Sequence, residues 1–393
     1  MKHMLLTACS AALSLCLALP VQADDTPIVI GVASSQTGTL EPWDKGAARG
    51  AELAVDDINA AGGLLGRPVE LVIRDTKSDP SLGPTAALEV LDAGSEMVLV
   101  ACDYDFGAPA ALTAISQGKI AMSSCAADAK FGVQGVGPLA YTQALATNGQ
   151  GALLAEFAAE QPGWDKVYIM QDTAIEYTKS LCANFRKRWV DLKGEDSILG
   201  EDTWNGLNDN AIAGQISRIK SDGADANFIV WCGFTNNGAM MRQLRSAGVD
   251  LPVLASESMD GSHWIEAVPD LSDFYIAVYA SIWGNDPDPK IAAFMTRFQE
   301  KFGEPARMGH VVTGYTAVEA WARAVEKAGS LDTTAIQTAL DGFTGEPLLT
   351  GPSTYTPDLH INLTSPMLMM KVTNGKYEPI GRRAAEKVYP PEF

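Results

Sequence analysis

The sequence has few of the residues and motifs on which catalysis usually depends. Histidine occurs four times in 393 residues, and His3 lies at the extreme N-terminus. The chain lacks a G-x-S-x-G elbow, an H-E-x-x-H zinc motif and a phosphate-binding P-loop. A relaxed G-x-G-x-x-A pattern at residues 135–140 follows no strand-like run and contains Pro138, so we interpret it as a loop. These absences argue against an enzyme, and no cofactor or metal is expected.

Positive charge is also scarce. Lys and Arg total 29 against 48 Asp and Glu, which gives a formal net charge of -19 at pH 7. Nucleic acids and anionic lipid surfaces attract basic proteins, so neither is an expected partner. The acidic balance does not identify a ligand, because solvated acidic surfaces are the ordinary case.

The N-terminus carries an apolar run that is short for a membrane span, which needs about 20 apolar residues. The run follows Lys2 and ends shortly before Ala23, where the sequence fits a small-residue cleavage site. We interpret residues 1–23 as a cleaved signal peptide of an exported protein. Lipid anchoring is the weaker alternative, because Cys9 comes too early and Cys16 follows a leucine where a small residue is expected.

Four cysteines remain after the signal peptide, an even number in a chain bound for an oxidising compartment. Four cysteines allow three pairings. We favour Cys102 with Cys125 and Cys182 with Cys232, because each pair would lie on neighbouring elements of one domain. Free buried thiols are the alternative.

The length exceeds that at which one hydrophobic core keeps growing, so two domains are expected. The run from Ile28 to Ala33 suits a strand buried on both faces of a parallel sheet. Helical spacing from Ala47 to Ala60 stops at Gly62-Gly63. The strand VELVIRD, a helix from Asp79-Pro80 to about Gly94 and the strand EMVLVAC follow. This alternation predicts a doubly wound α/β domain.

A second copy of the α/β pattern follows the first. Asn374-Gly375, between alternating residues near the C-terminus, predicts a β-hairpin. The other expected elements are the strand KVYIMQD, helices at 177–190 and 211–221, the strand ANFIVWCG, a helix after Asn237 and the strand PVLAS.

Ligands of open α/β sheets bind beyond the carboxyl ends of the strands. The informative loops therefore follow Ala33, Cys102, Ser123, Gln171, Gly233 and Ser256. These loops carry aromatic and acidic side chains that suit a small ligand with an amine or other cationic head. The candidates are Trp43, Asp103, Tyr104, Asp105, Phe106, Asp128, Tyr177, Phe234 and Glu257.

Several stretches resemble the branched-chain amino acid and amide binding proteins of ATP-driven importers. They are IVIGVASSQTGTL, GAELAVDDINAAGGLLGRPVELVIRDTKSDP, IAMSSCAAD, QDTAIEY, MMRQLRSAG and LASES, in the order found in that family. The resemblance implies the type I periplasmic binding fold, with two parallel-sheet lobes joined by a three-segment hinge. It places residues 24–145 and 281–351 in the N-terminal lobe and residues 146–280 and 352–393 in the C-terminal lobe.

The resemblance also implies how the protein works. A monomeric periplasmic protein would close its lobes on a small molecule and deliver it to an inner-membrane ABC permease. Ligand contacts would come from the loop at 103–106, from Ala126, Ala127 and Asp128, and from Glu257. Tyr177, Trp43 and Phe234 match aromatic positions around the ligand.

Two departures from the family place a leucine-like ligand in doubt. Cys102-Asp103-Tyr104-Asp105-Phe106 stands where a Ser-rich loop is expected, and Asp128 replaces a Thr. Carboxylates near an anion site repel a ligand carboxylate, so an amide, an amine, or a hydroxylated or aromatic compound becomes plausible. Lys77 stands near the place of the family's usual disulfide partner, which supports pairing Cys102 with Cys125.

Two rival functions stay open. A periplasmic sensor could use the same lobe closure, although signalling would need another protein. An exported enzyme would turn over a substrate with Asp103, Asp128 or Glu257. Replacing these acids would abolish binding in an importer and abolish a rate in an enzyme.

Overall fold

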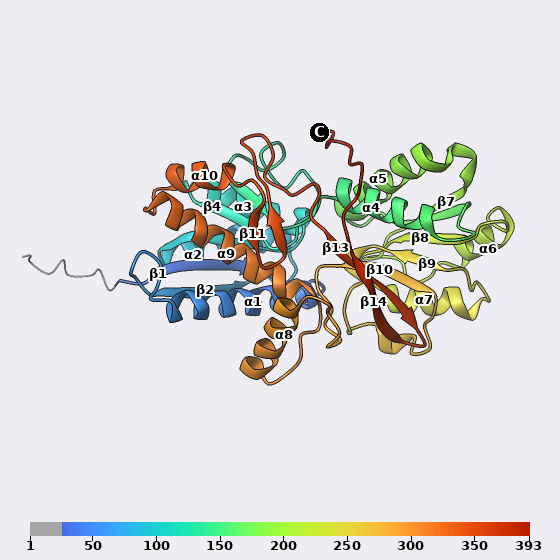
Figure 1. Ribbon diagram of the computed structural model, residues 1–393, viewed down its shortest axis with the longest axis horizontal. Helices are drawn as coiled ribbons and strands as arrows, with labels where there is room; N and C mark the ends of the chain where they lie inside the picture. Colours follow the sequence, from blue (N-terminus) through green and yellow to red (C-terminus); the bar gives the residue numbers. More distant parts are fainter. Residues whose placement is uncertain (1–25) are drawn as a thin grey trace, which may run out of the picture.

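The computed structural model describes residues 26–393, so the predicted signal peptide at residues 1–23 lies outside the described residues. Two α/β lobes lie side by side, each built around its own sheet (Figure 1). The predicted fold class, two doubly wound lobes of the type I periplasmic binding architecture, is confirmed. Within the described part of the chain, no helix is both long and apolar enough to cross a bilayer.

The sheet of the first lobe is wholly parallel, with the strand order β2-β1-β3-β4-β5. Its strands are β1 (Ile28–Ser34), β2 (Val69–Asp75), β3 (Ser95–Val100), β4 (Ile120–Ser123) and β5 (Ala140–Thr142). One face is covered by α1 (Glu41–Ala60), α9 (His310–Ala328) and α10 (Thr333–Asp341). The other face is covered by α2 (Gly83–Asp92) and α3 (Tyr104–Ser116). Burial on both faces explains the continuous apolar sequence of β1.

The second sheet has the order β14-β13-β10-β9-β8-β6-β7. Its parallel strands are β6 (Val167–Asp172), β7 (Ile198–Trp204), β8 (Phe228–Cys232), β9 (Val253–Ala255) and β10 (Phe274–Val278). The edge hairpin β13 (Met367–Thr373) and β14 (Lys376–Arg383) joins antiparallel, around the predicted Asn374-Gly375 turn. Asn374 and Gly375 have φ of 51° and 71°, as a type I′ turn requires. Helices α4 (Thr147–Glu160) and α5 (Glu176–Lys193) cover one face; α6 (Ala213–Ser221) and α7 (Asn237–Ser246) cover the other.

The chain passes between the lobes three times, as the resemblance implied. The passages connect β5 to α4, β10 to α8 (Pro289–Phe302), and the small hairpin β11 (Glu346–Leu348) and β12 (Gly351–Ser353) to β13. Helix α8 packs on the first lobe, where Arg297 Nη1 donates to Asp57 Oδ2 of α1 at 3.0 Å. The Leu145 N–H, in the first passage, donates to the Tyr279 hydroxyl, in the second, at 3.2 Å. The passages are therefore tied to one another beside the cleft.

Helices α1 and α9 lie unusually close because each carries a glycine at their contact. A Cβ on Gly50 would lie 1.9 Å from the carbonyl oxygen of Val311, and one on Gly314 would lie 2.0 Å from that of Ala47. Such distances are impossible for real carbon atoms, so only glycine allows this approach. The contact fixes His310, the first residue of α9, beside the part of α1 that faces the cleft.

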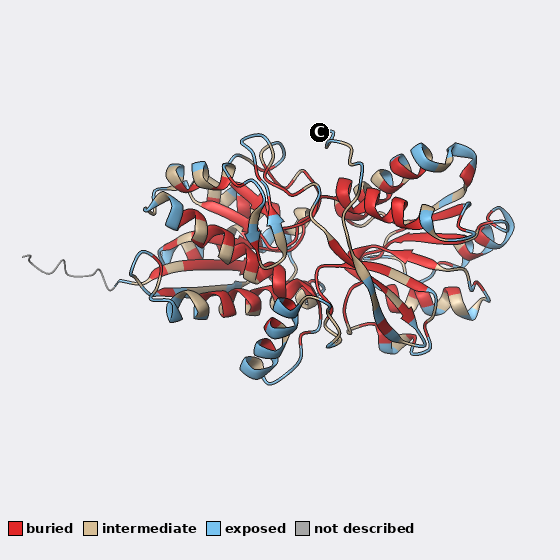
Figure 2. Cartoon of the chain, viewed as in Figure 1, coloured by how far each residue is buried: buried red, intermediate tan, exposed pale blue. Residues whose placement is uncertain are grey.

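Some helix boundaries differ from the predicted ones. Helix α1 begins at Glu41 rather than Ala47, because Pro42 occupies the first turn, where a missing N–H costs nothing. The segment after Asp79 opens as a 3-10 turn before α2 begins at Gly83. Residues 135–139 lie in turns and loop as predicted, and Ala140 begins β5. Buried residues continue through both sheets and across their junction (Figure 2).

Candidate functional site

A cavity lies where the carboxyl ends of the two sheets face each other. It is a narrow space of about 320 Å³, which includes the part that opens to solvent. All six loops singled out from the sequence contribute to its wall, from both lobes, because parallel strands present their carboxyl ends at one edge. The lining residues are Leu40, Trp43, Cys102, Asp103, Cys125, Ala127, Ile175, Tyr177, Phe234, Glu257 and Ser258.

Six of the eleven predicted site residues line this cavity: Trp43, Asp103, Ala127, Tyr177, Phe234 and Glu257. The other five, Tyr104, Asp105, Phe106, Ala126 and Asp128, lie outside the lining. Phe106 still packs near the wall, with its ring centroid 6.3 Å from that of Phe234. Ala126 is buried in the first lobe's core.

Aromatic side chains from both lobes meet at the cavity. The rings of Trp43, on α1, and Phe234, after β8, lie 5.5 Å apart between centroids with a tilt of 37°. Tyr177, near the start of α5, donates its hydroxyl hydrogen to Gln150 Oε1 at 3.0 Å. All three side chains are buried, so they present fixed apolar faces to the space between the lobes.

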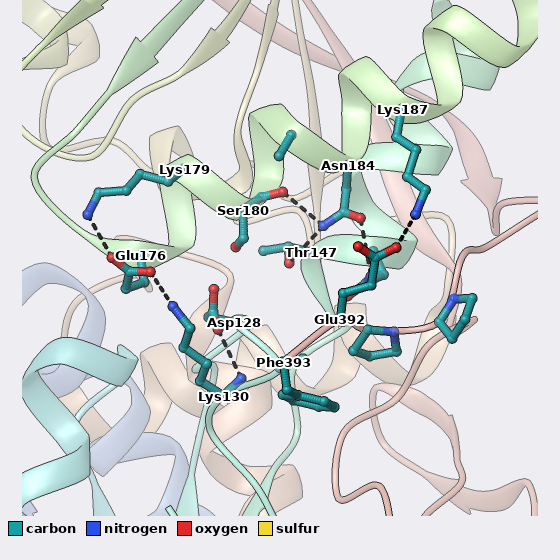
Figure 3. A pocket seen from close by; sticks show the side chains of 15 residues that line it. Asp128, Lys130, Thr147, Glu176, Lys179, Ser180, Asn184, Lys187, Glu392 and Phe393 are labelled. Carbon is teal, nitrogen blue, oxygen red and sulfur yellow. Dashed lines mark hydrogen bonds and ion pairs between the residues drawn. The ribbon is translucent and has the colours of Figure 1, made fainter. Parts of the chain in front are cut away.

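Asp105 and Asp128 lie outside the cavity, where the two lobes contact each other. Asp105 Oδ2 accepts the Glu176 N–H across the lobes at 2.8 Å. Asp128 lines a separate polar groove with Lys130, Glu176 and the C-terminal residues (Figure 3). Lys130 and Glu176 form an ion pair there, also across the lobes. These contacts join the two lobes outside the cavity.

Two buried carboxylates organise the loops of the two lobes in parallel ways. In the first lobe, Asp44 accepts the N–H groups of Ser35 at 2.6 Å and Cys102 at 2.7 Å. In the second lobe, Asp172 accepts the N–H groups of Gly206 at 2.8 Å and Phe234 at 3.2 Å. Each carboxylate thus holds together loops that follow different strands.

Asp103 caps helix α3 from the cavity wall. Its carboxylate accepts the N–H of Asp105 at 2.8 Å, so it meets the exposed donors of the helix start. Burial, together with the charge of Asp105, raises the pKa of Asp103 well above its ordinary value. The low-dielectric site therefore disfavours the charged form of this carboxyl.

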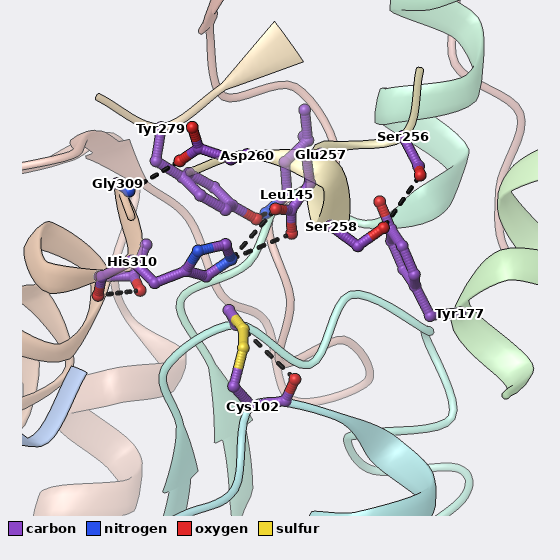
Figure 4. Close-up of polar contacts among 12 residues, drawn as sticks. Cys102, Leu145, Tyr177, Ser256, Glu257, Ser258, Asp260, Tyr279, Gly309 and His310 are labelled. Atoms are coloured by element: carbon purple, nitrogen blue, oxygen red, sulfur yellow. Dashed lines mark hydrogen bonds and ion pairs between the residues drawn. A yellow bond between two sulfur atoms is a disulfide. The ribbon is translucent and has the colours of Figure 1, made fainter. Parts of the chain in front are cut away.

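Glu257 is paired with His310 of the opposite lobe. His310 Nε2 lies 3.0 Å from Glu257 Oε2 and 3.4 Å from Oε1, and both side chains are buried (Figure 4). Burial lowers the pKa of His310, but the charges of Glu257, Asp260 and Asp44 raise it overall above its ordinary value. The pair therefore joins a loop of the second sheet to the first turn of α9 through a buried contact.

The structure contains the two favoured disulfides, Cys102–Cys125 and Cys182–Cys232. The sulfurs of Cys102 and Cys125 lie within 4.8 Å of a ring nitrogen of His310, a spacing that could suit a metal ion. A metal would need these sulfurs as thiolates, and here they are joined to each other. The disulfide instead forms part of the cavity wall.

Sequence reasoning missed His310 and the lining residues Leu40, Ile175 and Ser258, and it named Cys102 and Cys125 only as disulfide cysteines. His310 is a lone histidine in a helical pattern, and its partner Glu257 is 53 positions away, so no local motif marks it. The Ser258 hydroxyl donates to the carbonyl oxygen of Gly233. This serine is therefore not set up as a nucleophile beside the Glu257–His310 pair.

The charge cluster around His310 predicts a measurable dependence of stability on pH. Burial raises the pKa of Asp260 to about 6, and its Oδ2 accepts the Gly309 N–H at 2.7 Å. The folded chain therefore binds this proton more tightly than the unfolded chain does. Protonation of Asp260 therefore stabilises the folded state. This stabilisation is fully present when the pH is below 3.8, the ordinary pKa of an aspartate, and it is lost as the pH rises through about 6.

When the pH is lowered from 7.5 to 5, we expect the unfolding free energy of the wild type to rise by about 1 to 2 kcal/mol more than that of Asp260→Asn. Urea unfolding at both pH values measures this difference. Asp225→Asn, which changes an exposed carboxylate, is the control and is expected to track the wild type. A constant difference between wild type and Asp260→Asn would contradict the raised pKa.

Two α/β lobes, three connecting passages and a cavity between the facing sheet edges are typical of a two-lobed solute-binding protein. The model of the family described as "Periplasmic binding protein" matches residues 27–376. The chain belongs to the periplasmic binding protein family, whose members imply a periplasmic location.

Three similar proteins are named for small organic molecules or were solved in complex with them. The leucine-, isoleucine-, valine-, threonine- and alanine-binding protein of Pseudomonas aeruginosa is 27% identical over 82% of this chain and 84% of its own. The solved structure of LivJ from Streptococcus pneumoniae, in complex with isoleucine, has a TM-score of 0.79 at 23% identity, covering 91% of this chain and 99% of LivJ. A solute-binding protein from R. palustris in complex with benzoate has a TM-score of 0.76 at 15% identity, covering 91% and 97%.

Proposed function

We propose that this chain is the solute-capturing subunit of an ABC importer. It binds a small organic molecule in the periplasm, closes its lobes around it and delivers it unchanged to an inner-membrane permease. The observation that carries the proposal is the cavity, which takes buried side chains from six loops of two lobes. Relatives named for aliphatic amino acids, and solved neighbours holding isoleucine or benzoate, support a ligand of this size.

The lobes are proposed to move as two rigid bodies about the three passages. Strands β1 to β5, helices α1 to α3 and α8 to α10 and the β11–β12 hairpin form one body, and the elements from α4 to β10 with the β13–β14 hairpin form the other. We therefore place the boundary expected at residue 351 after β12, which ends at Ser353. Polar contacts between the bodies, such as the Glu176 N–H with Asp105 and His310 with Glu257, hold the closed arrangement. A ligand that contacts both walls adds to these contacts and shifts the population toward closure.

A thermal-shift screen of the mature protein against amino acids, amides, amines, polyols and aromatic compounds tests this proposal. A solute at about a hundred times its Kd stabilises the folded state by roughly 2.7 kcal/mol, or about 5 to 10 °C for lobes of this size. We expect the Trp43→Ala variant to bind such a solute at least tenfold more weakly, because Trp43 supplies a buried aromatic face to the cavity.

Trp283→Ala is the matched control. Trp283 stacks on Tyr377 with ring centroids 4.5 Å apart and does not line the cavity, so its loss leaves the affinity unchanged. Equal affinity in wild type and Trp43→Ala would place the ligand elsewhere. A screen in which no solute raises the melting temperature would contradict solute capture itself.

A further inference from the structure

The charged groups of the cavity wall bear on the kind of solute that fits, given the proposed function. Among the residues that the structure describes, no Lys or Arg lines this cavity. The ionisable acids in the wall are Asp103 and Glu257, and each already has a protein partner. The wall thus offers no positive side chain to an anion and no unpaired carboxylate to a cation.

A ligand ammonium group would have to compete with His310 for Glu257. The imidazole approaches both carboxylate oxygens, at 3.0 Å and 3.4 Å, and its side chain is buried. Displacing it would leave the buried imidazole without its partner, and an unsatisfied buried polar group costs free energy. A cationic ligand therefore gains little from the acid that faces it.

A ligand carboxylate would meet two obstacles. The first is Asp103, which occupies the donors at the start of α3 with its own side chain. The second is the excess of acids around the cavity, since Asp44 and Asp260 lie behind the wall beside His310. An α-amino acid carries both an ammonium and a carboxylate, so it would meet all of these costs at once.

The rest of the wall suits an uncharged ring. Leu40, Trp43, Ile175 and Phe234 supply apolar surface, and the Cys102–Cys125 disulfide adds polarizable sulfur. Glu257 and Ser258 lie in the wall beside these groups as polar contacts for a neutral hydroxyl. We propose that the cavity takes an uncharged aromatic molecule with a hydroxyl group in preference to an α-amino acid.

Four compounds with a benzene ring but different charges test whether charge sets the preference: benzyl alcohol, benzylamine, benzoate and phenylalanine. Calorimetry of the mature protein at pH 7.5 is expected to give benzyl alcohol a Kd at least tenfold below those of the other three. Tighter or equal binding of any charged member overturns the inference. So does binding of leucine or isoleucine with no binding of benzyl alcohol, which would leave the proposed solute capture standing. If none of these compounds binds and the broader screen also finds no ligand, both the inference and the proposed solute capture are overturned.

His310→Gln tests the pair directly, since it removes the imidazole from Glu257. Benzylamine is expected to gain at least tenfold in affinity relative to the wild type, while benzyl alcohol does not gain. His360→Gln is the matched control, because His360 is also buried and paired, with its Nε2 2.9 Å from Asp341 Oδ1, but lies away from the cavity. An unchanged affinity for benzylamine in a folded His310→Gln protein would show that the pair does not set the preference.

Discussion

Replacing Arg188 by alanine is expected to lower the free energy of unfolding by about 3 to 5 kcal/mol, the usual cost of breaking a buried ion pair. Arg188, on α5, is buried and donates through Nε to Glu156 Oε1 of α4 at 2.8 Å. Glu156 also accepts the N–H groups of Glu386 at 2.7 Å and Lys387 at 3.1 Å. Without Arg188, a buried carboxylate loses its cation, and the C-terminal segment loses support. Urea unfolding followed by circular dichroism measures the loss.

Arg186→Ala on the same helix is the matched control. Arg186 pairs with Glu195 and Glu201 at the surface, where its side chain is 40% exposed, so the expected loss is about 0.2 to 1 kcal/mol. The combined change Glu156→Gln with Arg188→Met removes both charges and is expected to recover most of the loss, while the Gln carbonyl still accepts a backbone N–H. Similar losses for Arg188→Ala and Arg186→Ala would contradict the role given to the buried pair.

The strands were predictable because the residues of each strand alone show whether both of its faces are buried. Strands buried on both faces need continuous apolar runs, and β1 shows such a run. The turn at Asn374-Gly375 was also predictable from its own residues, because Asn and Gly are favoured where φ is positive at both positions. The start of α1 was missed because Pro42 serves as well in a loop as in a first helical turn.

The location of the site followed from topology, but its chemistry did not. Knowing that ligands bind beyond the strand ends was enough to name the six loops that meet at the cavity. The same reasoning interpreted Glu257 and Asp103 as free acids for a ligand amine. The structure gives both an internal partner, His310 and the start of α3. Such pairings depend on how two lobes pack, and His310 comes from a helix far from Glu257 in sequence.

Removing the Cys182–Cys232 disulfide is expected to lower the free energy of unfolding by about 4 kcal/mol. Cys182 lies on α5 and Cys232 ends β8, and 50 positions separate them in the sequence. In the chain-entropy model a cross-link limits the unfolded chain more strongly as the loop it closes grows, which gives roughly this value for a loop of about 50 residues. The Cys182→Ala, Cys232→Ala double variant, compared with the wild type by urea unfolding, measures the effect.

The second disulfide provides the control, because it differs in both loop length and position. Cys102 and Cys125 are separated by 23 positions, so the same model gives their removal a somewhat smaller loss of stability. These two residues line the cavity, whereas Cys182 and Cys232 are packed in the second lobe's core. Removing Cys102 and Cys125 should therefore also weaken solute binding, and removing Cys182 and Cys232 should lower stability alone. Equal affinity losses in the two double variants would mean that the second lobe's disulfide also shapes the cavity, and the assignment of that wall to Cys102 and Cys125 would be wrong.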